Sequence, residues 1–170
     1  MNPPEIPAWR AMTTSDLAAV AVLSARVHPN YPERPEVLAE KFRLFPQGCF
    51  ALAGGKAIAG YCFSHPWRKG APPSLDTFLE ELPRDANSYF IHDLTLDVSM
   101  RKKNLPAALV PDLICAAQEA GLPHMALVAV NGSAPFWSRM GFQRTGDEAI
   151  QAAARSKYDA DTVHMERSLE

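Results

Sequence analysis

The sequence contains few cysteines, and their positions exclude the two kinds of structure that most often depend on them. Among 170 residues there are only Cys49, Cys62 and Cys115, which form neither a CxxC pair nor a Cys/His spacing typical of zinc. His124 and His164 also lack metal-spaced partners, so no bound metal is expected. An odd, sparse set of cysteines indicates buried thiols in a reducing compartment rather than a disulfide scaffold.

Long hydrophobic runs and an excess of one charge are also absent. No apolar stretch approaches the roughly 20 residues that cross a bilayer, and residues 1–7 lack the basic start and apolar core of a signal peptide. The formal net charge is −2, which gives no broad electrostatic surface for nucleic acid or an anionic membrane. We therefore expect a cytoplasmic protein with neither a nucleic-acid nor a membrane partner.

The composition is otherwise that of a globular protein, with 47% hydrophobic and 21% charged residues. The length suits a single domain over residues 1–170. One long loop is expected at 66–74, which combines prolines with Gly70. Residue spacing and turn signals predict strands at 8–12, 49–53, 57–64, 89–98, 125–130 and 162–169, and helices at 17–24, 35–45, 105–120 and 133–140.

The order of these elements indicates the fold class. The expected order is β-α-α-β-β-β-α-β-α-β-β, which has one C-terminal strand more than the ranges above, and one strand–helix–strand unit over 89–130 lies inside a largely antiparallel set. A helix that crosses over between two strands pairs them in parallel. The sequence therefore predicts an α/β (α+β) fold, with a mixed, mostly antiparallel sheet of about seven strands flanked by about four helices.

The segment from Leu94 to Val110 carries the clearest functional signal. A strand ends, a short basic loop follows, and an amphipathic helix begins. This arrangement directs backbone N–H groups and a positive helix dipole toward one point, which suits a phosphate or pyrophosphate. Arg101, Lys102 and Lys103 add three cations there. Taken alone, three basic residues favour a solvated turn over a phosphate site.

This segment resembles the acetyl-CoA-binding motif of GNAT acetyltransferases, which runs Leu-Ala-Val-x-Pro-x-x-Arg-Gly-x-Gly-x-Gly/Ala before a helix. Leu94-Thr95-Leu96 fall on its strand end, and Arg101 on the residue that opens the phosphate loop. Residues 9–17 resemble the family's first strand and helix entry, and residues 130–142 its second cofactor motif. The resemblance spans nearly the whole chain. It implies a GNAT fold and direct transfer of an acetyl group from acetyl-CoA to a primary amine of a small molecule or peptide.

The resemblance also implies where the cofactor binds. The pantetheine arm would pair with the backbone from Leu96 to Val98, and the Leu96 N–H would polarise the acetyl carbonyl. Asn131 would contact the pantetheine amides. The expected cofactor-binding residues are Leu96, Val98, Arg101, Lys102, Lys103, Asn104, Leu105, Pro106, Ala107, Asn131, Phe136 and Trp137.

The loop departs from the family pattern at three positions. Lys102 and Asn104 replace loop glycines, and Pro106 replaces the last Gly/Ala. Asparagine is the best non-glycine substitute for a left-handed backbone, and proline is tolerated in a first helical turn although it removes one N–H donor. We expect weakened cofactor binding that depends more on the cations, and hence on salt, than a glycine-rich loop would require.

Acetyl transfer needs a free amine, and a general base near it helps. His92 and Asp93 lie on the predicted strand beside the reactive end of the cofactor, and we expect them to face opposite sides of the sheet. His92 has the better intrinsic pKa for a base; a His–Asp pair that only stabilises the strand is the alternative. Trp137 stands where many relatives have an acidic tyrosine, so Ser133 or a water would protonate the thiolate.

The acceptor side is less determined. Tyr31 and Trp67 fall in loops that border the acceptor site in this architecture, where they would line a pocket. Arg68 would meet a substrate carboxylate or be solvated. A homodimer is compatible with the sequence. The alternative function is a non-catalytic GNAT-like module that binds an acyl-CoA as a sensor or scaffold, which the missing glycines and tyrosine favour.

Overall fold

The computed structural model describes residues 5–101 and 103–170. Seven strands form one sheet in the order β1-β2-β3-β4-β5-β7-β6, and every neighbouring pair is antiparallel except β4 and β5. The predicted mixed, mostly antiparallel sheet is confirmed. The strands are β1 (Ala8–Ala11), β2 (Cys49–Gly54), β3 (Ala57–Trp67), β4 (Ser88–Leu96), β5 (His124–Ala129), β6 (Gln143–Arg144) and β7 (Val163–Ser168).

Five α-helices accompany the sheet, one more than the sequence pattern predicts. They are α1 (Leu17–Val27), α2 (Pro35–Leu44), α3 (Leu105–Glu119), α4 (Ala134–Arg139) and α5 (Glu148–Lys157). The additional helix is α5. The Asp147 side chain caps it by accepting from the N–H groups of Ala149 and Ile150. Its buried Gln151 donates to the carbonyls of Thr145 and His164, which fixes α5 against β7.

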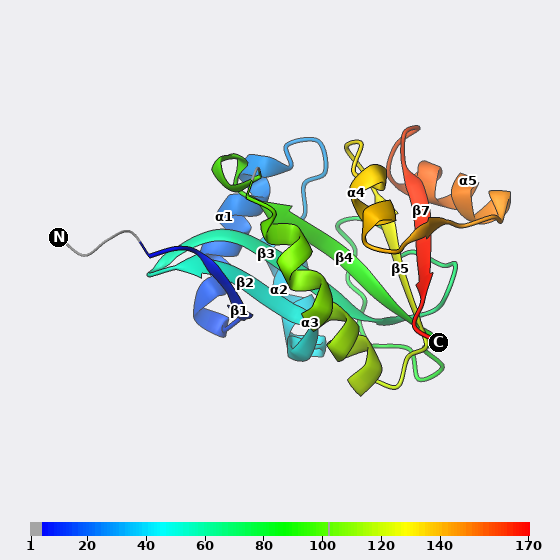
Figure 1. Cartoon of the computed structure of the whole chain (residues 1–170), viewed down its shortest axis with the longest axis horizontal. Coiled ribbons are helices and arrows are strands. Elements are labelled where there is room, and N and C mark those ends of the chain that lie inside the picture. The colour runs from blue at the N-terminus through cyan, green and yellow to red at the C-terminus, as the bar shows by residue number, and fades with distance from the viewer. Residues whose placement is uncertain (1–4, 102) are drawn as a thin grey trace.

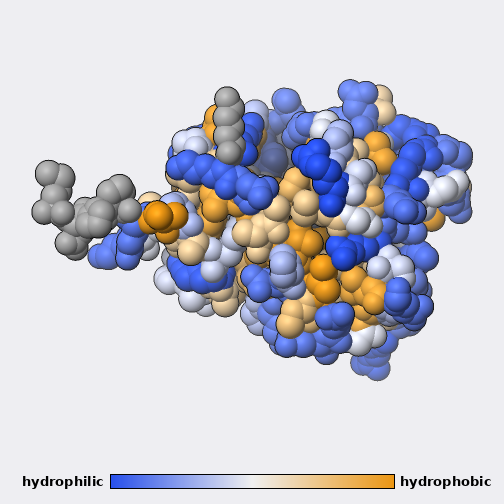
Figure 2. All heavy atoms as spheres, in the orientation of Figure 1, coloured by the Kyte–Doolittle hydropathy of each residue, from blue (hydrophilic) through white to orange (hydrophobic). Residues whose placement is uncertain are grey.

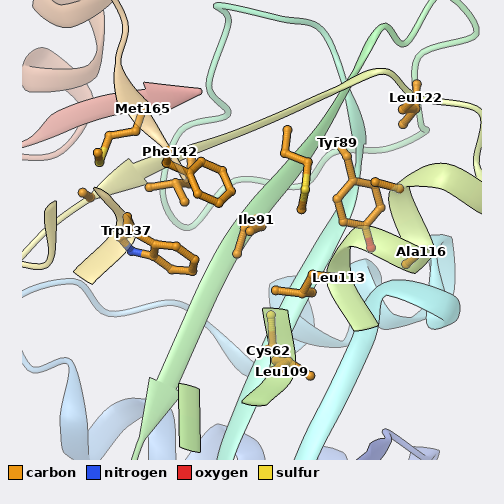
Figure 3. Packing of buried hydrophobic residues seen from close by; sticks show 14 residues of the cluster. Cys62, Tyr89, Ile91, Leu109, Leu113, Ala116, Leu122, Trp137, Phe142 and Met165 are labelled. Atoms are coloured by element: carbon orange, nitrogen blue, oxygen red, sulfur yellow. The ribbon is translucent and has the colours of Figure 1, made fainter. Parts of the chain in front are cut away.

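The helices divide between the two faces of the sheet, with α3 on one face and α1 and α2 on the other (Figure 1). The core beneath α3 includes Leu109, Leu113 and, from α4, Trp137. Figure 3 shows Trp137 and Phe142 on one side of Ile91, with Leu113 and Tyr89 on the other. On the surface, hydrophobic side chains gather near the centre of this face within a hydrophilic border (Figure 2). The opposite core joins α1 and α2 to Tyr61 and Phe63 of β3.

The long loop after β3 covers residues 68–87, because β3 ends at Trp67 and β4 begins only at Ser88. The predicted loop, 66–74, thus started two residues too early and ended too soon. Segment 33–40 holds it in place. The Glu40 carboxylate accepts from the N–H groups of Leu79 and Glu80, at 2.6 and 3.0 Å. Arg34 pairs with Asp76 at 3.0 Å. This loop consequently lies against the same face of the sheet as α2.

Two of the three cysteines are buried as expected, and one is not. Cys49 and Cys62 are buried, whereas Cys115 is exposed. The expectation of a buried thiol was wrong for Cys115 because the buried positions of α3 (Leu109, Leu113, Ala116 and Ala117) lie on the face toward the sheet, and residue 115 falls on the other. Among the described residues, the helices are all too short or too polar to traverse a bilayer.

Candidate active site

The two parallel strands diverge after only three residue pairs. Tyr89, Phe90 and Ile91 of β4 pair with Met125, Ala126 and Leu127 of β5, after which β4 continues to Leu96 and β5 to Ala129. A cavity of about 690 Å³ opens at this point, which is ample for part of a cofactor and a small acceptor. Its walls come from the ends of both strands, residues 27–31 after α1, the start of α3, and α4.

The cavity brings together ten of the residues singled out from the sequence. They are Tyr31, His92, Asp93, Leu96, Arg101, Pro106, Asn131, Ser133, Phe136 and Trp137. Seven others lie in described segments but do not line the cavity. These are Val98, Lys103, Asn104, Leu105 and Ala107 near the start of α3, and Trp67 at the end of β3, with Arg68 following it. Lys102 lies outside the described residues.

The loop before α3 adopts the backbone that its substitutions favour. Asn104 has φ 54° and ψ 22°, the left-handed conformation for which asparagine replaces glycine most readily. Pro106 lies in the first turn of α3. Both conformational predictions are confirmed. Trp9 of β1 donates from its indole Nε1 to the Leu105 carbonyl at 2.7 Å, which ties this end of α3 to the edge of the sheet.

The backbone of β4 faces the opening between the strands at alternate residues. The Asp97 N–H donates to the Ala59 carbonyl of β3 at 2.8 Å. Because neighbouring residues of a strand direct their N–H and C=O groups to opposite edges, those of Leu96 point away from β3, toward β5. The ladder with β5 has ended at Ile91–Leu127. The Leu96 peptide groups are therefore directed into the opening, where an extended ligand can pair with them.

A β-bulge corrects the expectation that His92 and Asp93 face opposite sides of the sheet. Ile91 pairs with Ser64 and Asp93 pairs with Phe63, so β4 has one more residue here than β3. Such an extra residue interrupts the alternation of side chains. Both side chains contact the segment between α1 and α2: His92 contacts Glu33, and Asp93 lies beside His28. The prediction was wrong because side chains alternate only along a regular strand, and the extra residue of β4 interrupts that regularity here.

His92 is among the residues that line the cavity, but its imidazole turns to Glu33 and is not exposed there. Its side chain is 0% exposed, and its Nε2 lies 3.0 and 3.2 Å from the two carboxylate oxygens of Glu33. The Lys41 ammonium lies 3.7 Å from the same carboxylate. Burial raises the pKa of Glu33, but His92 and Lys41 outweigh that effect and lower the pKa to about 2. Glu33 is thus a buried carboxylate that remains ionised.

Asp93 occupies the accessible end of a second polar network. Its carboxylate accepts from the Tyr61 hydroxyl at 2.7 Å and from the Thr95 hydroxyl at 2.6 Å. His28 Nε2 lies 2.6 Å from the Thr95 hydroxyl and 3.5 Å from Asp93 Oδ1. The Asp93 and His28 side chains are each 16% exposed, and both residues line the cavity. The hydrogen bond to Asp93 raises the pKa of His28 against the opposing effect of burial.

Several members of these networks are not among the residues predicted from the sequence. Glu33, Lys41, Tyr61 and Thr95 lie far apart in the chain, and His28 belongs to the loop that leads to Tyr31. The sequence does contain one signal for Lys41. Lys41 follows Leu38 by three residues and Val37 by four, so it lies on the buried stripe of α2, where a lysine needs a buried partner. No comparable pattern indicates Tyr61, which sits within an apolar strand.

The segment after β5 closes the far side of the cavity. Asn131 and Gly132 both have positive φ, 54° and 70°, which turns the chain sharply into α4. Trp137 of α4 is 7% exposed and packs edge-on against Phe136 and Phe142, with ring centres 4.9 and 5.4 Å apart. Trp137 therefore belongs to the core as well as to the cavity wall.

The three expected acceptor-side residues are in different environments. Tyr31 lines the cavity, and its hydroxyl donates to Asp159. Trp67 donates from Nε1 to the Ala71 carbonyl at 2.7 Å within the loop after β3. Arg68 pairs with the exposed Asp85 at 2.9 Å. Within the described part of the chain, no three His, Cys, Asp or Glu side chains are grouped so that they could hold a metal ion.

Comparison with known proteins gives a consistent picture of the fold. No protein-family model matches the sequence, and no curated protein matches it. The loading GNATL domain of CurA from Lyngbya majuscula has a TM-score of 0.75 over 95% of this chain and 97% of that one, at 12% identity.

Two further solved structures match at a TM-score of 0.70. The GNAT-like decarboxylase GphF in complex with isobutyryl-CoA is 17% identical and matches over 95% of this chain and 99% of that one. The NatC complex bound to Gag peptide and CoA is 14% identical, over 96% and 99%. The chain has the GNAT fold, as its sequence motifs predict.

Proposed function

We propose that this protein transfers an acetyl group from acetyl-CoA to a primary amine. The observation that carries the proposal is the cavity at the divergence of β4 and β5. Arg101, Pro106 in the first turn of α3, and the Asp93–His28 pair all line it. Neighbours of the same fold are bound to CoA or isobutyryl-CoA in their solved structures, which supports an acyl-CoA donor here.

The donor would lie along the opening between the strands. The Leu96 backbone groups would pair with the pantetheine arm. Asn131, in the turn after β5, would contact the amides of that arm. The pyrophosphate would meet Arg101 and the N-terminus of α3, where the dipole and unpaired N–H groups favour an anion. Lys103 and the described loop residues Asn104, Leu105 and Ala107 would border it, and Lys102 extends the basic sequence. Phe136 and Trp137 would cover the acyl end.

Asp93 is the better placed of the two candidate bases, because the His92 imidazole turns to Glu33 and is not exposed. An amine arrives mostly as an ammonium ion, which the Asp93 carboxylate attracts. Asp93 or the adjacent His28 takes one proton, and the free amine attacks the thioester carbonyl. The Leu96 N–H stabilises the developing oxyanion. A C–N bond forms, the C–S bond breaks and the CoA thiolate leaves, and the excess proton on the new amide nitrogen passes through Ser133 or a water to the thiolate.

The acceptor would enter past Tyr31, between the segment after α1 and the loop before β7. A small molecule or a flexible peptide end fits a cavity of this size, and the NatC neighbour was solved with a peptide. We also propose that the protein is cytoplasmic, because acetyl-CoA is available in the cytoplasm.

The proposal is tested by mixing the purified protein with acetyl-CoA and a broad panel of amines and peptides, and following thiol release. We expect turnover with at least one amine and its loss in Asp93→Asn. The matched control is Asp85→Asn, which alters an exposed carboxylate outside the cavity wall. A protein that neither binds CoA nor releases thiol with any amine would overturn the proposal.

One observation favours a second function, a non-catalytic module that binds acyl-CoA. The indole of Trp137 occupies the position of the family's tyrosine and is fixed in the core, so it offers no acidic hydroxyl for the leaving thiolate. Thermal unfolding with acetyl-CoA and with free CoA separates the two functions. Strong stabilisation by both ligands without thiol release would support the binding module. Thiol release that depends on Asp93 would exclude it.

A further inference from the structure

The side chain of Tyr61 lies in the core between β3 and helices α1 and α2, and its hydroxyl reaches a residue of the cavity wall. Tyr61 is 0% exposed. Its hydroxyl donates to Asp93 Oδ2 at 2.7 Å. Asp93 lines the cavity, whereas Tyr61 is not among the residues that line it. Any effect of Tyr61 on the cavity therefore passes through a neighbour such as Asp93.

The register of β3 and β4 brings the two side chains together. Tyr61 pairs with Thr95, and Asp93 lies two residues before Thr95, beyond the bulge, so all three side chains are on one face of the sheet. Diagonal neighbours across two antiparallel strands are about 7–8 Å apart, which is within reach of an aromatic side chain. A tyrosine at position 61 is thus long enough to bring a hydroxyl to Asp93.

Both oxygens of the Asp93 carboxylate have a donor, Tyr61 on Oδ2 and the Thr95 hydroxyl on Oδ1, at 2.7 and 2.6 Å. A carboxylate only accepts, so the single hydroxyl hydrogen of Thr95 is directed to Asp93. In the 2.6 Å contact between His28 Nε2 and Thr95 Oγ1, His28 is then the donor, in its neutral and its charged form alike. The hydrogen bonds consequently all run toward Asp93.

The Tyr61 hydroxyl keeps its hydrogen and is a permanent donor. Burial, and then the nearby charge of Asp93, raise the pKa of Tyr61 well above its usual value. The Asp93 side chain is only 16% exposed, and a charge that is largely buried needs such hydrogen bonds. Tyr61 and Thr95 together satisfy the side of the carboxylate that faces the core.

We propose that Tyr61 is a positioning residue: its hydroxyl, with Thr95 on the other oxygen, fixes the Asp93 carboxylate so that its remaining lone pairs are available to the acceptor ammonium. A carboxylate has about four lone-pair sites, and these two hydrogen bonds use two of them. Without the Tyr61 hydroxyl the carboxylate rotates more freely, and the amine is aligned for attack less often. The effect on the rate rests on the proposed acetyl transfer, whereas the orientation of Asp93 does not.

Proton NMR of the full chain tests the contact without any substrate. We expect a Tyr61 hydroxyl resonance that is protected from exchange with solvent. It should shift upfield in Asp93→Asn, because an amide oxygen is a weaker acceptor than a carboxylate. Asp85→Asn, which changes an exposed carboxylate paired with Arg68, should leave it in place. Rapid exchange of this hydrogen, or a resonance that does not respond to Asp93→Asn, would overturn the proposal.

A double-mutant cycle tests the role in the reaction. Tyr61→Phe keeps the ring and should lower kcat/KM for the amine by about tenfold, with an unchanged KM for acetyl-CoA. In Asp93→Asn the same change should have less than about a twofold further effect, because Tyr61 acts through Asp93. Equal losses in both backgrounds would show that Tyr61 contributes packing alone, which would overturn the proposal.

The matched control is Tyr89→Phe. Tyr89 is also 0% exposed, its hydroxyl lies 2.7 Å from that of Ser64, and it is not among the residues that line the cavity. This variant should leave kcat/KM unchanged. A loss equal to that of Tyr61→Phe would contradict the assigned role.

Thr95→Val is the second variant if Tyr61→Phe does not fold. It removes the donor to Oδ1 and keeps the size of the side chain, so kcat/KM should fall by a similar factor, again only where Asp93 is present. An unchanged kcat/KM would overturn the positioning of Asp93 by its donors. Absence of turnover with every amine would instead refute the acetyl transfer, while a Tyr61 resonance that depends on Asp93 would still support the positioning.

Discussion

The residues proposed to hold the cofactor and those proposed to act on the acceptor, called below the cofactor end and the acceptor end of the site, are positioned by different means. The proposed cofactor end consists of backbone geometry: the left-handed Asn104, the first turn of α3, and the sharp turn at Asn131, with Arg101 at the surface. The proposed acceptor end consists of buried side chains from segments far apart in sequence, with Asp93 bonded to Tyr61 and Thr95, and His92 to Glu33. Changes at the first end should alter binding slightly, whereas changes at the second should remove activity or unfold the protein.

The largest effect is expected from Asp93→Asn. The amide keeps the size of the side chain but cannot take a proton, so kcat/KM for acetyl transfer should fall by about 10²–10⁴-fold. Steady-state thiol release measures it, with the concentration of folded protein checked for each variant. An unchanged pH profile and rate in Asp93→Asn would remove the carboxylate from the mechanism and leave His28 alone as the candidate base.

The next largest effect should come from Glu33→Gln. Glu33 carries the charge that pairs with the buried Lys41, and removing one member of a buried pair typically costs about 3–5 kcal/mol of unfolding free energy. Urea unfolding measures the difference. Glu148→Gln is the control, because Glu148 forms an exposed pair with Arg144 and should change stability little.

Acid should lower the unfolding free energy of the wild-type protein by part of the amount that Glu33→Gln removes. The pKa of Glu33 is about 2 in the folded chain and about 4.3 when unfolded. A lowered pKa contributes stability that is complete above pH ~4.3 and is lost as pH falls toward 2. The gap in unfolding free energy between wild type and Glu33→Gln should therefore narrow from pH 6 to pH 3. A constant gap would mean that Glu33 is not ionised when buried.

A smaller effect, on the affinity for CoA, is expected from Arg101→Ala among the residues proposed to hold the cofactor. Arg101→Ala removes an exposed cation, which should weaken CoA binding by about fivefold at low salt, the equivalent of ~1 kcal/mol. Calorimetric titration at low and high salt measures it, and wild type should approach the variant as salt rises. Salt-independent affinity in the wild type would show that backbone groups, not cations, dominate phosphate binding.

The smallest effect concerns the left-handed residue itself. Asn104→Gly should raise the unfolding free energy by up to about 1 kcal/mol, and Asn104→Ala should lower it by a similar amount, because only glycine is unstrained at this φ. Asn131 has the same φ of 54° and offers a matched pair of variants. Equal stability of the glycine and alanine variants at both sites would contradict the strain argument.

The predictions from the sequence were correct where a feature depends on residues close together in the chain, and less so where it depends on distant ones. The strand–helix–strand unit, the left-handed Asn104 and Pro106 in the first turn of α3 depend on neighbours within a few residues, and all were predictable. Helix α5 was not among the predicted elements although a local signal exists, because Asp147 is a favoured N-cap and Glu148–Lys157 consists largely of strong helix formers. What no local signal gives is its position, which hydrogen bonds from Gln151 to Thr145 and to the backbone of β7 fix.

The sequence by itself therefore determined the order of most elements, the class of fold and the backbone conformation of Asn104 and Pro106 before α3, since each follows from local conformational preference and hydrophobic periodicity. The tertiary structure alone decided which of the two candidate bases, His92 or Asp93, has a side chain that is accessible from the cavity. The bulge opposite Phe63 and Ser64 places His92 and Asp93 on one face, and the burial of Glu33 and Lys41 then withdraws His92. Strand register and the pairing of buried charges join residues up to 60 positions apart, so no local pattern encodes them.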